Sequence, residues 1–266
     1  MNITIIGTGN IGGAIAKGLS RGTIVTAADI TCADRSQASL DKLTEFNREF
    51  RTSLDNRTAV RTADIVIIAV KPWMVQGVVE EIKPTLDYSR QTVVSVAAGI
   101  TFEQLREFLS KEGDGRRSLP PVFRVIPNTA IEALSSMTFV STCNATEEET
   151  ALVLGLFDDL GKAMLVDERL MMAGTALASS GIAFAFRYIR AAIEGGVELG
   201  FYPQEAQEIV VNTVRGAVEL LLANRSNPEQ EIDRVTTPGG ITIRGLNEME
   251  LSGFTSAVIR GLKASK

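Results

Sequence analysis

The chain has 266 residues, a formal net charge of −5 and a hydrophobic fraction of 45%. This length suits one large or two medium domains, and the acidic balance gives no reason to expect a nucleic-acid partner. The chain contains no histidine, which excludes serine–histidine–aspartate and cysteine–histidine nucleophiles and histidine-ligated zinc. Its two cysteines, Cys32 and Cys143, form no metal motif and suit a reducing compartment. No basic and apolar leader opens the sequence, so we expect a cytoplasmic protein. Because the sequence has no metal-binding motif, we expect no bound metal.

A strand-like run at residues 2–6 leads into the motif GTGNIG at 7–12 and then a helix-like stretch. In this context the glycines predict a dinucleotide-binding turn rather than a plain structural one. Gly7 allows the tight turn, Gly9 admits a pyrophosphate close to the backbone, and Gly12 lets the helix pack closely on the sheet. The first N–H groups of the helix would face the phosphate. The expected cofactor contacts here are Gly7, Gly9, Asn10, Ile11 and Gly12.

Strand and helix signals alternate through the first part of the chain, as they do in a doubly wound parallel sheet. The apolar runs predict strands that end near Asp34 and that cover 64–70, 92–96, 122–126, 137–141 and 162–166. Helical spacing and capping residues predict helices at 36–47, 73–82 and 101–109 and one that begins at Thr146. The polar stretch between Lys111 and Pro121 is typical of an exposed loop.

Strand signals stop after residue 167. Helices are expected at 170–199 (one helix or a broken pair), 203–223, from Pro228, and at 243–251 and 254–263. The sequence therefore predicts an α/β chain with an N-terminal Rossmann dinucleotide-binding domain at 1–166. An all-helical domain for substrate contacts and dimerisation would follow at 167–266.

One segment of the helical part contains no charged residue, from Leu170 to Phe186. At this length it is near the lower limit for a membrane span. Its glycine, alanine, serine and threonine content makes its hydrophobicity modest. We therefore expect a helix buried in a core or a subunit interface, and no membrane partner.

The second strand is expected to end at Asp34-Arg35-Ser36, where the adenosine ribose of a bound dinucleotide would lie. Asp34 would accept hydrogen bonds from ribose hydroxyls and favour NAD. Arg35 and Ser36 would bind a 2′-phosphate and favour NADP. NADP is the expected cofactor, with NAD possible, and a solvated turn is the alternative interpretation.

Three further candidates follow predicted strands, at the edge of the sheet where ligands bind. Val70, Lys71 and Pro72 would line the nicotinamide pocket, although Lys71 also suits a surface position. Ala97 would admit a flat ring. Asn128 would hydrogen-bond a carboxamide or substrate, or else form an Asx turn.

The segment Thr236-Thr237-Pro238-Gly239-Gly240-Ile241-Thr242 precedes a predicted helix. Two glycines ahead of a helix N-terminus offer unobstructed N–H groups, which can bind an anion such as a substrate carboxylate. A helix-linking turn with hydroxyl caps is the alternative.

Several motifs together resemble the pyrroline-5-carboxylate reductases, nearly end to end. They are GTGNIG at 7–12, AVKP at 69–72, VAAGIT at 96–101, RVIPNTA at 124–130, GGVELGF at 195–201, VTTPGGITIRGL at 235–246 and MELSGF at 249–254.

The resemblance implies NAD(P)H-dependent reduction of 1-pyrroline-5-carboxylate, a cyclic imine carboxylate, to L-proline, the last step of proline biosynthesis. It also implies a dimer or a multiple of dimers. A related imine or hydroxyacid reductase on the same plan is the alternative. Carried over to this chain, Thr242 and Thr237 become the catalytic residues. The substrate-binding residues become Asn128, Gly239, Gly240 and Ile241.

The sequence departs from the family pattern at a few positions. Ala178, Ile182 and Phe184 replace a hydroxyl, a proline and a tyrosine of one family segment. Ala130 replaces the proline of PNTP, and Ser252 the first glycine of GGF. These differences concern substrate preference rather than the cofactor motif.

Overall fold

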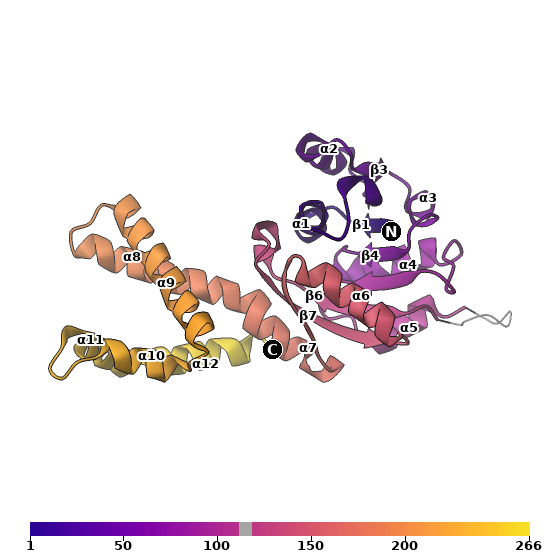
Figure 1. The fold of residues 1–266 in the computed structure, drawn as a ribbon. Coiled ribbons are helices and arrows are strands. Elements are labelled where there is room, and N and C mark those ends of the chain that lie inside the picture. Colours follow the sequence, from indigo (N-terminus) through magenta and orange to yellow (C-terminus); the bar gives the residue numbers. More distant parts are fainter. Residues whose placement is uncertain (112–118) are drawn as a thin grey trace. The chain divides into compact units, whose positions relative to one another are not determined.

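The computed structural model describes residues 1–111 and 119–266, so most of the loop expected at 111–121 lies outside the described residues. The first part of the chain forms an eight-stranded sheet in the order β3-β2-β1-β4-β5-β6-β7-β8. Figure 1 labels β1, β3, β4, β6 and β7 of this sheet. The strands are β1 (Ile3–Ile6), β2 (Ile30–Ala33), β3 (Arg51–Ser53), β4 (Ile65–Ile68), β5 (Thr92–Ser95), β6 (Val122–Ile126), β7 (Ser136–Cys143) and β8 (Gly161–Leu165).

The order reverses between β1 and β4, which pair in parallel from Ile3 with Ile65 to Ile6 with Ile68. This is the doubly wound Rossmann arrangement, and it confirms the predicted fold class. The sheet is not parallel throughout, because β7 runs antiparallel to β6 while β8 runs parallel to β7. Residues 127–135 between β6 and β7 contain only a short 3-10 turn, η3 (Thr129–Ala133). That connection is too short for the crossover that a parallel pair requires.

Helices cover both faces of the sheet and close two apolar clusters. Leu19, Leu43 and Phe157 pack on one face, and Val60, Val79 and Leu105 pack on the other. The helices of the first face are α1 (Asn10–Leu19), α2 (Gln37–Phe46) and α6 (Glu147–Asp158), and those of the second are α3 (Asn56–Val60), α4 (Val75–Ile82) and α5 (Phe102–Leu109).

The predicted caps of two helices are confirmed. Thr101 and Thr146 each form a capping box, in which the threonine side chain accepts from the third helical N–H and Gln104 or Glu149 returns the bond. The predicted helix at 73–82 needs a correction at its start. A 3-10 turn, η2 (Pro72–Met74), precedes α4, and Trp73 is 79% exposed instead of lying on the buried face.

The chain divides into two compact units, Met1–Ser179 and Ser180–Lys266. The first unit includes residues beyond β8, namely η4 (Glu168–Leu170) and α7 (Met171–Gly174). Glu168 accepts from the buried Arg124 side chain at 2.6 Å and from the Phe102 N–H at 2.7 Å. A Cβ on Gly174 would lie 2.7 Å from the Phe139 ring, so this part of the chain packs closely on β7. The expected boundary after residue 166 stays a prediction.

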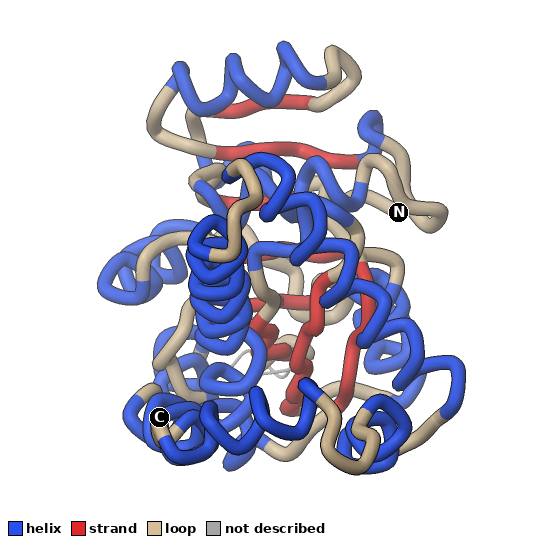
Figure 2. Tube along the Cα trace, turned by 90° about the vertical axis from the view of Figure 1, so that its left-hand side faces the viewer, coloured by secondary structure: helices blue, strands red, loops and turns tan. Residues whose placement is uncertain are grey.

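The second unit is helical throughout, as predicted (Figure 2). It contains α8 (Gly181–Glu198), α9 (Pro203–Asn224), α10 (Pro228–Val235), α11 (Ile241–Leu251) and α12 (Phe254–Ala264). Pro203 and Pro228 each occupy the first position of a helix, where a missing N–H costs nothing.

Residues 168–198 form one helical run, in which residues Thr175–Ser180 have π-helical geometry. By length and composition alone this run could cross a membrane, and only 17% of its most apolar window is buried. The expectation that it is buried in the core of a single chain is therefore wrong. The subunit interface remains as the explanation for its composition.

Candidate cofactor and substrate sites

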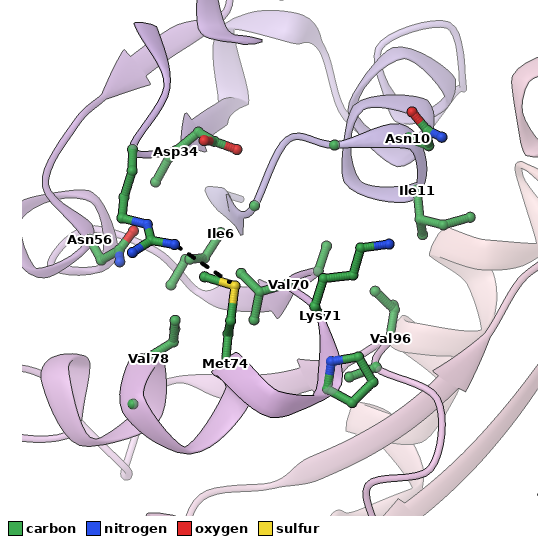
Figure 3. Close-up of a pocket in the computed structure, with 18 of the residues that line it drawn as sticks. Ile6, Asn10, Ile11, Asp34, Asn56, Val70, Lys71, Met74, Val78 and Val96 are labelled. Atoms are coloured by element: carbon green, nitrogen blue, oxygen red, sulfur yellow. Dashed lines mark hydrogen bonds between the residues drawn. The ribbon is translucent and has the colours of Figure 1, made fainter.

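A cavity of about 810 Å³ opens where β1, β2, β4 and β5 end, at the point where the strand order reverses. Ligands bind at this position in open α/β sheets. In Figure 3, Asn10 and Ile11 lie at one end of the cavity and Asp34 and Asn56 lie at the other.

The glycine turn fits the predicted roles. Gly7 has φ +90°, which favours glycine, and its N–H donates to the Ala33 carbonyl at 2.8 Å. A Cβ on Gly12 would lie 1.9 Å from the Gly7 carbonyl oxygen, so a side chain there would push α1 off the turn. Gly9 lines the cavity, and a Cβ there would meet no protein atom within 4 Å. The open side of the turn therefore faces the cavity at the N-terminus of α1, which suits a pyrophosphate.

Asp34 ties the end of β2 to the glycine turn. One of its carboxylate oxygens accepts from the N–H and the hydroxyl of Thr8, and the other accepts from the N–H of Ser36 at 2.9 Å. Burial raises the pKa of Asp34, but these hydrogen bonds outweigh it and hold the pKa below the usual range. Both oxygens are thus engaged inside the chain, which weakens the case for Asp34 as the ribose acceptor that favours NAD.

Arg35 lies beside Asp34 and is exposed. Its guanidinium contacts the Met74 sulfur at 3.8 Å, drawn as the dashed line in Figure 3. In the part of the chain that the structure describes, no carboxylate forms an ion pair with Arg35. An unpaired guanidinium at this end of the cavity is a suitable partner for a phosphate.

Most of the predicted cofactor residues line this one cavity, and two do not. Gly12 lies behind the turn within α1, and Ser36 is the N-cap of α2. The predicted residues that do line it are Gly7, Gly9, Asn10, Ile11, Asp34, Arg35, Val70, Lys71, Pro72 and Ala97.

Five lining residues at the Arg35 end were not predicted, namely Asn56, Met74, Gly77, Val78 and Glu81. Asn56 begins α3, a helix that the sequence did not suggest. Gly77, Val78 and Glu81 lie along α4, and their spacing could have indicated that they share a face.

Asn128 forms the Asx turn that was the alternative interpretation. Its side-chain oxygen accepts from the Ala130 N–H at 3.1 Å, and its amide nitrogen lies 3.5 Å from the Ala178 carbonyl. The residue is buried and does not line the cavity. Contact with a substrate therefore stays a proposal.

The loop at 236–242 belongs to the second unit. Gly239 has φ +71°, and the Gly240 N–H donates to the Thr237 carbonyl at 2.9 Å. The N–H groups that remain for an anion are those of Gly239 and of the first turn of α11, which begins at Ile241. Arg244, which the sequence analysis did not single out, donates to the Gly240 carbonyl at 3.4 Å and places a positive charge beside the loop.

The two threonines expected to be catalytic are exposed at either side of this loop. Within the described residues, neither the Thr237 nor the Thr242 hydroxyl donates or accepts a protein hydrogen bond. The Thr236 hydroxyl differs, because it donates to the Ile232 carbonyl at 3.1 Å and so caps α10.

Comparisons with known proteins show which family the chain resembles. Residues 168–266 match the family "Pyrroline-5-carboxylate reductase dimerisation", and residues 2–99 match "NADP oxidoreductase coenzyme F420-dependent". Pyrroline-5-carboxylate reductase of Methanosarcina acetivorans is 35% identical, over 99% of this chain and 96% of its own. The chain belongs to the pyrroline-5-carboxylate reductase family.

Two further relatives support this membership. Pyrroline-5-carboxylate reductase 1 of Dictyostelium discoideum is 36% identical over 99% of this chain, which spans about half of that longer protein (48%). The solved structure of a pyrroline-5-carboxylate reductase from Coxiella burnetii has a TM-score of 0.87 at 28% identity, and the match covers 99% of this chain and 95% of that one. The predictions of an oxidoreductase with an NADP-binding Rossmann domain and a dimerisation domain are confirmed.

Two of the positions at which the sequence departs from the pattern of the pyrroline-5-carboxylate reductase family lie close to Asn128 in the structure. Ala178, where the family has a hydroxyl, lies in the π-helical segment, and its carbonyl is the one that Asn128 approaches. Ala130 supplies the N–H of the Asx turn. Both replacements therefore lie beside Asn128.

Proposed function

We propose that this enzyme reduces 1-pyrroline-5-carboxylate to L-proline with NADPH. Family membership over nearly the whole chain supports the reaction. The observation that supports it most directly is the conjunction of a dinucleotide cavity in the first unit with an anion-binding loop in the second. The proposed substrate is a small cyclic imine with a carboxylate. The cavity would hold the dinucleotide that donates the hydride, and the loop would hold the carboxylate of the substrate.

The residues of the cavity fit a phosphorylated dinucleotide. The glycine turn and the N-terminus of α1 would hold the pyrophosphate, and Arg35 would hold the 2′-phosphate. Val70, Pro72 and Ala97 would surround the nicotinamide with apolar surface. When bound, the cofactor supplies the hydride that reduces C5 of the imine.

The loop at 236–242 would hold the substrate. Backbone N–H groups at Gly239 and Ile241 would donate to the carboxylate, with the charge of Arg244 nearby. The Gly240 N–H serves the loop itself. The Thr242 hydroxyl would orient the ring nitrogen, and Thr237 would support the same group. These roles rest on the family motif and on the exposed, unengaged hydroxyls described above.

Proton supply limits how the reaction can proceed. An imine is most electrophilic when its nitrogen is protonated, and no histidine is present to deliver a proton. A substrate that arrives as the iminium ion needs no strong acid from the protein. The residues then orient the reacting atoms and exclude water, which is the usual contribution of a protein to cofactor chemistry.

The test is oxidation of NADPH, followed by its absorbance, with 1-pyrroline-5-carboxylate as substrate. A panel of 2-oxo acids and other cyclic imines is run in parallel, because departures such as Ala178 concern substrate preference. We expect the five-membered imine carboxylate to give the highest kcat/KM. Faster turnover of a 2-oxo acid would replace this proposal with a hydroxyacid dehydrogenase.

We also propose a cytoplasmic location and assembly as a dimer or a multiple of dimers, without membrane or nucleic-acid partners. Both cysteines are free, and Cys32 is buried, which suits a reducing compartment.

A further inference from the structure

The wall of the cavity formed by α4 has a regular composition. Met74, the last residue of η2, and Gly77, Val78 and Glu81 of α4 all line the cavity, and the spacing of the three α4 residues places them on one face of the helix. The first three present flat, apolar surface, and a Cβ on Gly77 would meet no protein atom within 4 Å. The fourth ends this surface with a carboxylate. Such a wall suits a planar ring that has a polar group at its far edge.

The far edge displays hydrogen-bond acceptors. One oxygen of Glu81 accepts from the Asn56 side-chain amide at 3.0 Å. This bond fixes the amide nitrogen of Asn56 toward Glu81, and its side-chain oxygen then points elsewhere. Within the described residues, the second Glu81 oxygen and the Asn56 oxygen have no hydrogen-bond partner.

The charge of Glu81 is not neutralised by a neighbour. Arg57 donates to the Glu81 backbone carbonyl at 3.1 Å and not to its carboxylate. No lysine or arginine in residues 1–111 and 119–266 forms an ion pair with that carboxylate. A half-buried carboxylate that has no cationic partner favours a ligand that donates a hydrogen bond to it.

We propose that Glu81, with Asn56 held beside it, reads the exocyclic amine of the cofactor's adenine ring and makes the enzyme selective for adenine. This inference rests on the proposed binding of NADPH and deepens it. Met74, Gly77 and Val78 would take the face of the purine, and the free Glu81 oxygen would accept from the amine. A purine with a carbonyl in that position would set oxygen against oxygen.

The experiment compares the affinities of NADP⁺ and of its hypoxanthine analogue, in which a carbonyl replaces the exocyclic amine. Both are titrated by calorimetry without substrate. The wild-type protein should bind NADP⁺ about tenfold more tightly, as expected for one hydrogen bond to a charged acceptor. Glu81→Ala should remove most of that preference, chiefly by weakening the binding of NADP⁺ and also by removing the oxygen–oxygen contact with the analogue.

Glu81→Gln keeps the volume of the side chain and gives a different result. Its amide can turn an N–H toward the ring carbonyl, so the preference should fall because the analogue binds more tightly. A purely structural role for Glu81 would weaken both ligands equally in both variants. The matched control is Glu80→Ala, because Glu80 is exposed on the same helix and bonds only to Gln76 among the described residues. That variant should keep the wild-type preference.

Three outcomes would overturn the inference. They are equal affinity of the wild-type protein for the two dinucleotides, a preference that persists in Glu81→Ala, and a loss of preference in Glu80→Ala. Failure of the proposed function looks different, since a wild-type protein that binds NADP⁺ without oxidising NADPH in the presence of the imine contradicts the reaction and leaves the base preference intact.

Discussion

The carboxylate of Asp34 accepts two hydrogen bonds from Thr8, one from the backbone N–H at 2.7 Å and one from the hydroxyl at 3.0 Å. This pair joins residues 26 positions apart in the sequence and fixes the glycine turn against the end of β2. Asp34 therefore acts on the cofactor site by holding its shape.

Asp34→Ala should lower the free energy of unfolding at neutral pH by about 1–3 kcal/mol, because the N–H and the hydroxyl of the buried Thr8 lose their acceptor. The folded-state pKa of Asp34 lies below its unfolded value. The stability it contributes is thus present above the unfolded pKa of about 4 and is lost as the pH falls through the folded pKa. Denaturant titrations of the variant and the wild type should differ at about pH 7 and converge at lower pH. Asp41→Ala on α2 is the control, and an equal loss there would contradict a specific role for Asp34.

Arg35→Ala tests the assignment of NADPH. Loss of one charge-assisted contact to the 2′-phosphate should raise the KM for NADPH roughly ten- to one-hundredfold. The KM for NADH should change little, since NADH has no phosphate at that position. Lys42→Ala removes an exposed positive charge from α2 and serves as the control for net charge. An equal loss with both dinucleotides would show that Arg35 does not recognise the phosphate.

Thr242→Val removes a hydroxyl and leaves the shape of the side chain nearly unchanged. If the hydroxyl orients the ring nitrogen, kcat should fall by about one to two orders of magnitude, or roughly 1.5–3 kcal/mol in transition-state stabilisation. Cofactor affinity and the thermal midpoint should stay close to wild type. Full activity in this variant would make Thr242 a structural residue.

Gly240→Val should affect substrate binding instead. A Cβ at this position would lie 2.6 Å from the Thr237 hydroxyl oxygen and 2.9 Å from its carbonyl oxygen, so the loop must rearrange. The KM for the imine should rise while the affinity for NADPH, measured by titration, is retained. Loss of NADPH affinity to the same degree would contradict a local effect.

Association of two or more chains should be stable at micromolar concentration. The second unit exposes large apolar side chains from several helices, among them Phe186, Leu199, Leu222, Ile241 and Leu251. Exposed apolar surface of this extent is typical of an interface. Light scattering across a dilution series should report a dimer or a multiple of it, and a monomer throughout the series would refute this prediction.

Local signals in the sequence were sufficient for most elements. The apolar run at 64–70 predicted a strand buried on both faces, and Thr101 predicted a capped helix start. β3 was missed because Arg51–Ser53 is short and partly exposed at the edge of the sheet, where no apolar pattern is required. The direction of β7 depends on the length of a connection, and the apolar pattern does not encode that.

The candidate site was predictable only in part, for a related reason. Gly7 and Gly9 act through the backbone within one turn, so a local motif reveals them. Asn56 and Glu81 are 25 residues apart in the sequence and their side chains share a hydrogen bond. Nothing in the local sequence around either residue indicates that contact. The Gly240 N–H differs, because it donates to the Thr237 carbonyl within its own loop, a detail of turn geometry that the motif does not specify.

The exposed Trp73 is the single tryptophan of the chain and stands between Pro72 and Met74, both of which line the cavity. Because its indole is already in water, its emission should shift little when the chain unfolds. The emission band of indole overlaps the absorption of reduced nicotinamide, so a dinucleotide in the cavity should quench it by energy transfer. The fluorescence of this protein is therefore a sensitive gauge of cofactor occupancy and a poor gauge of folding.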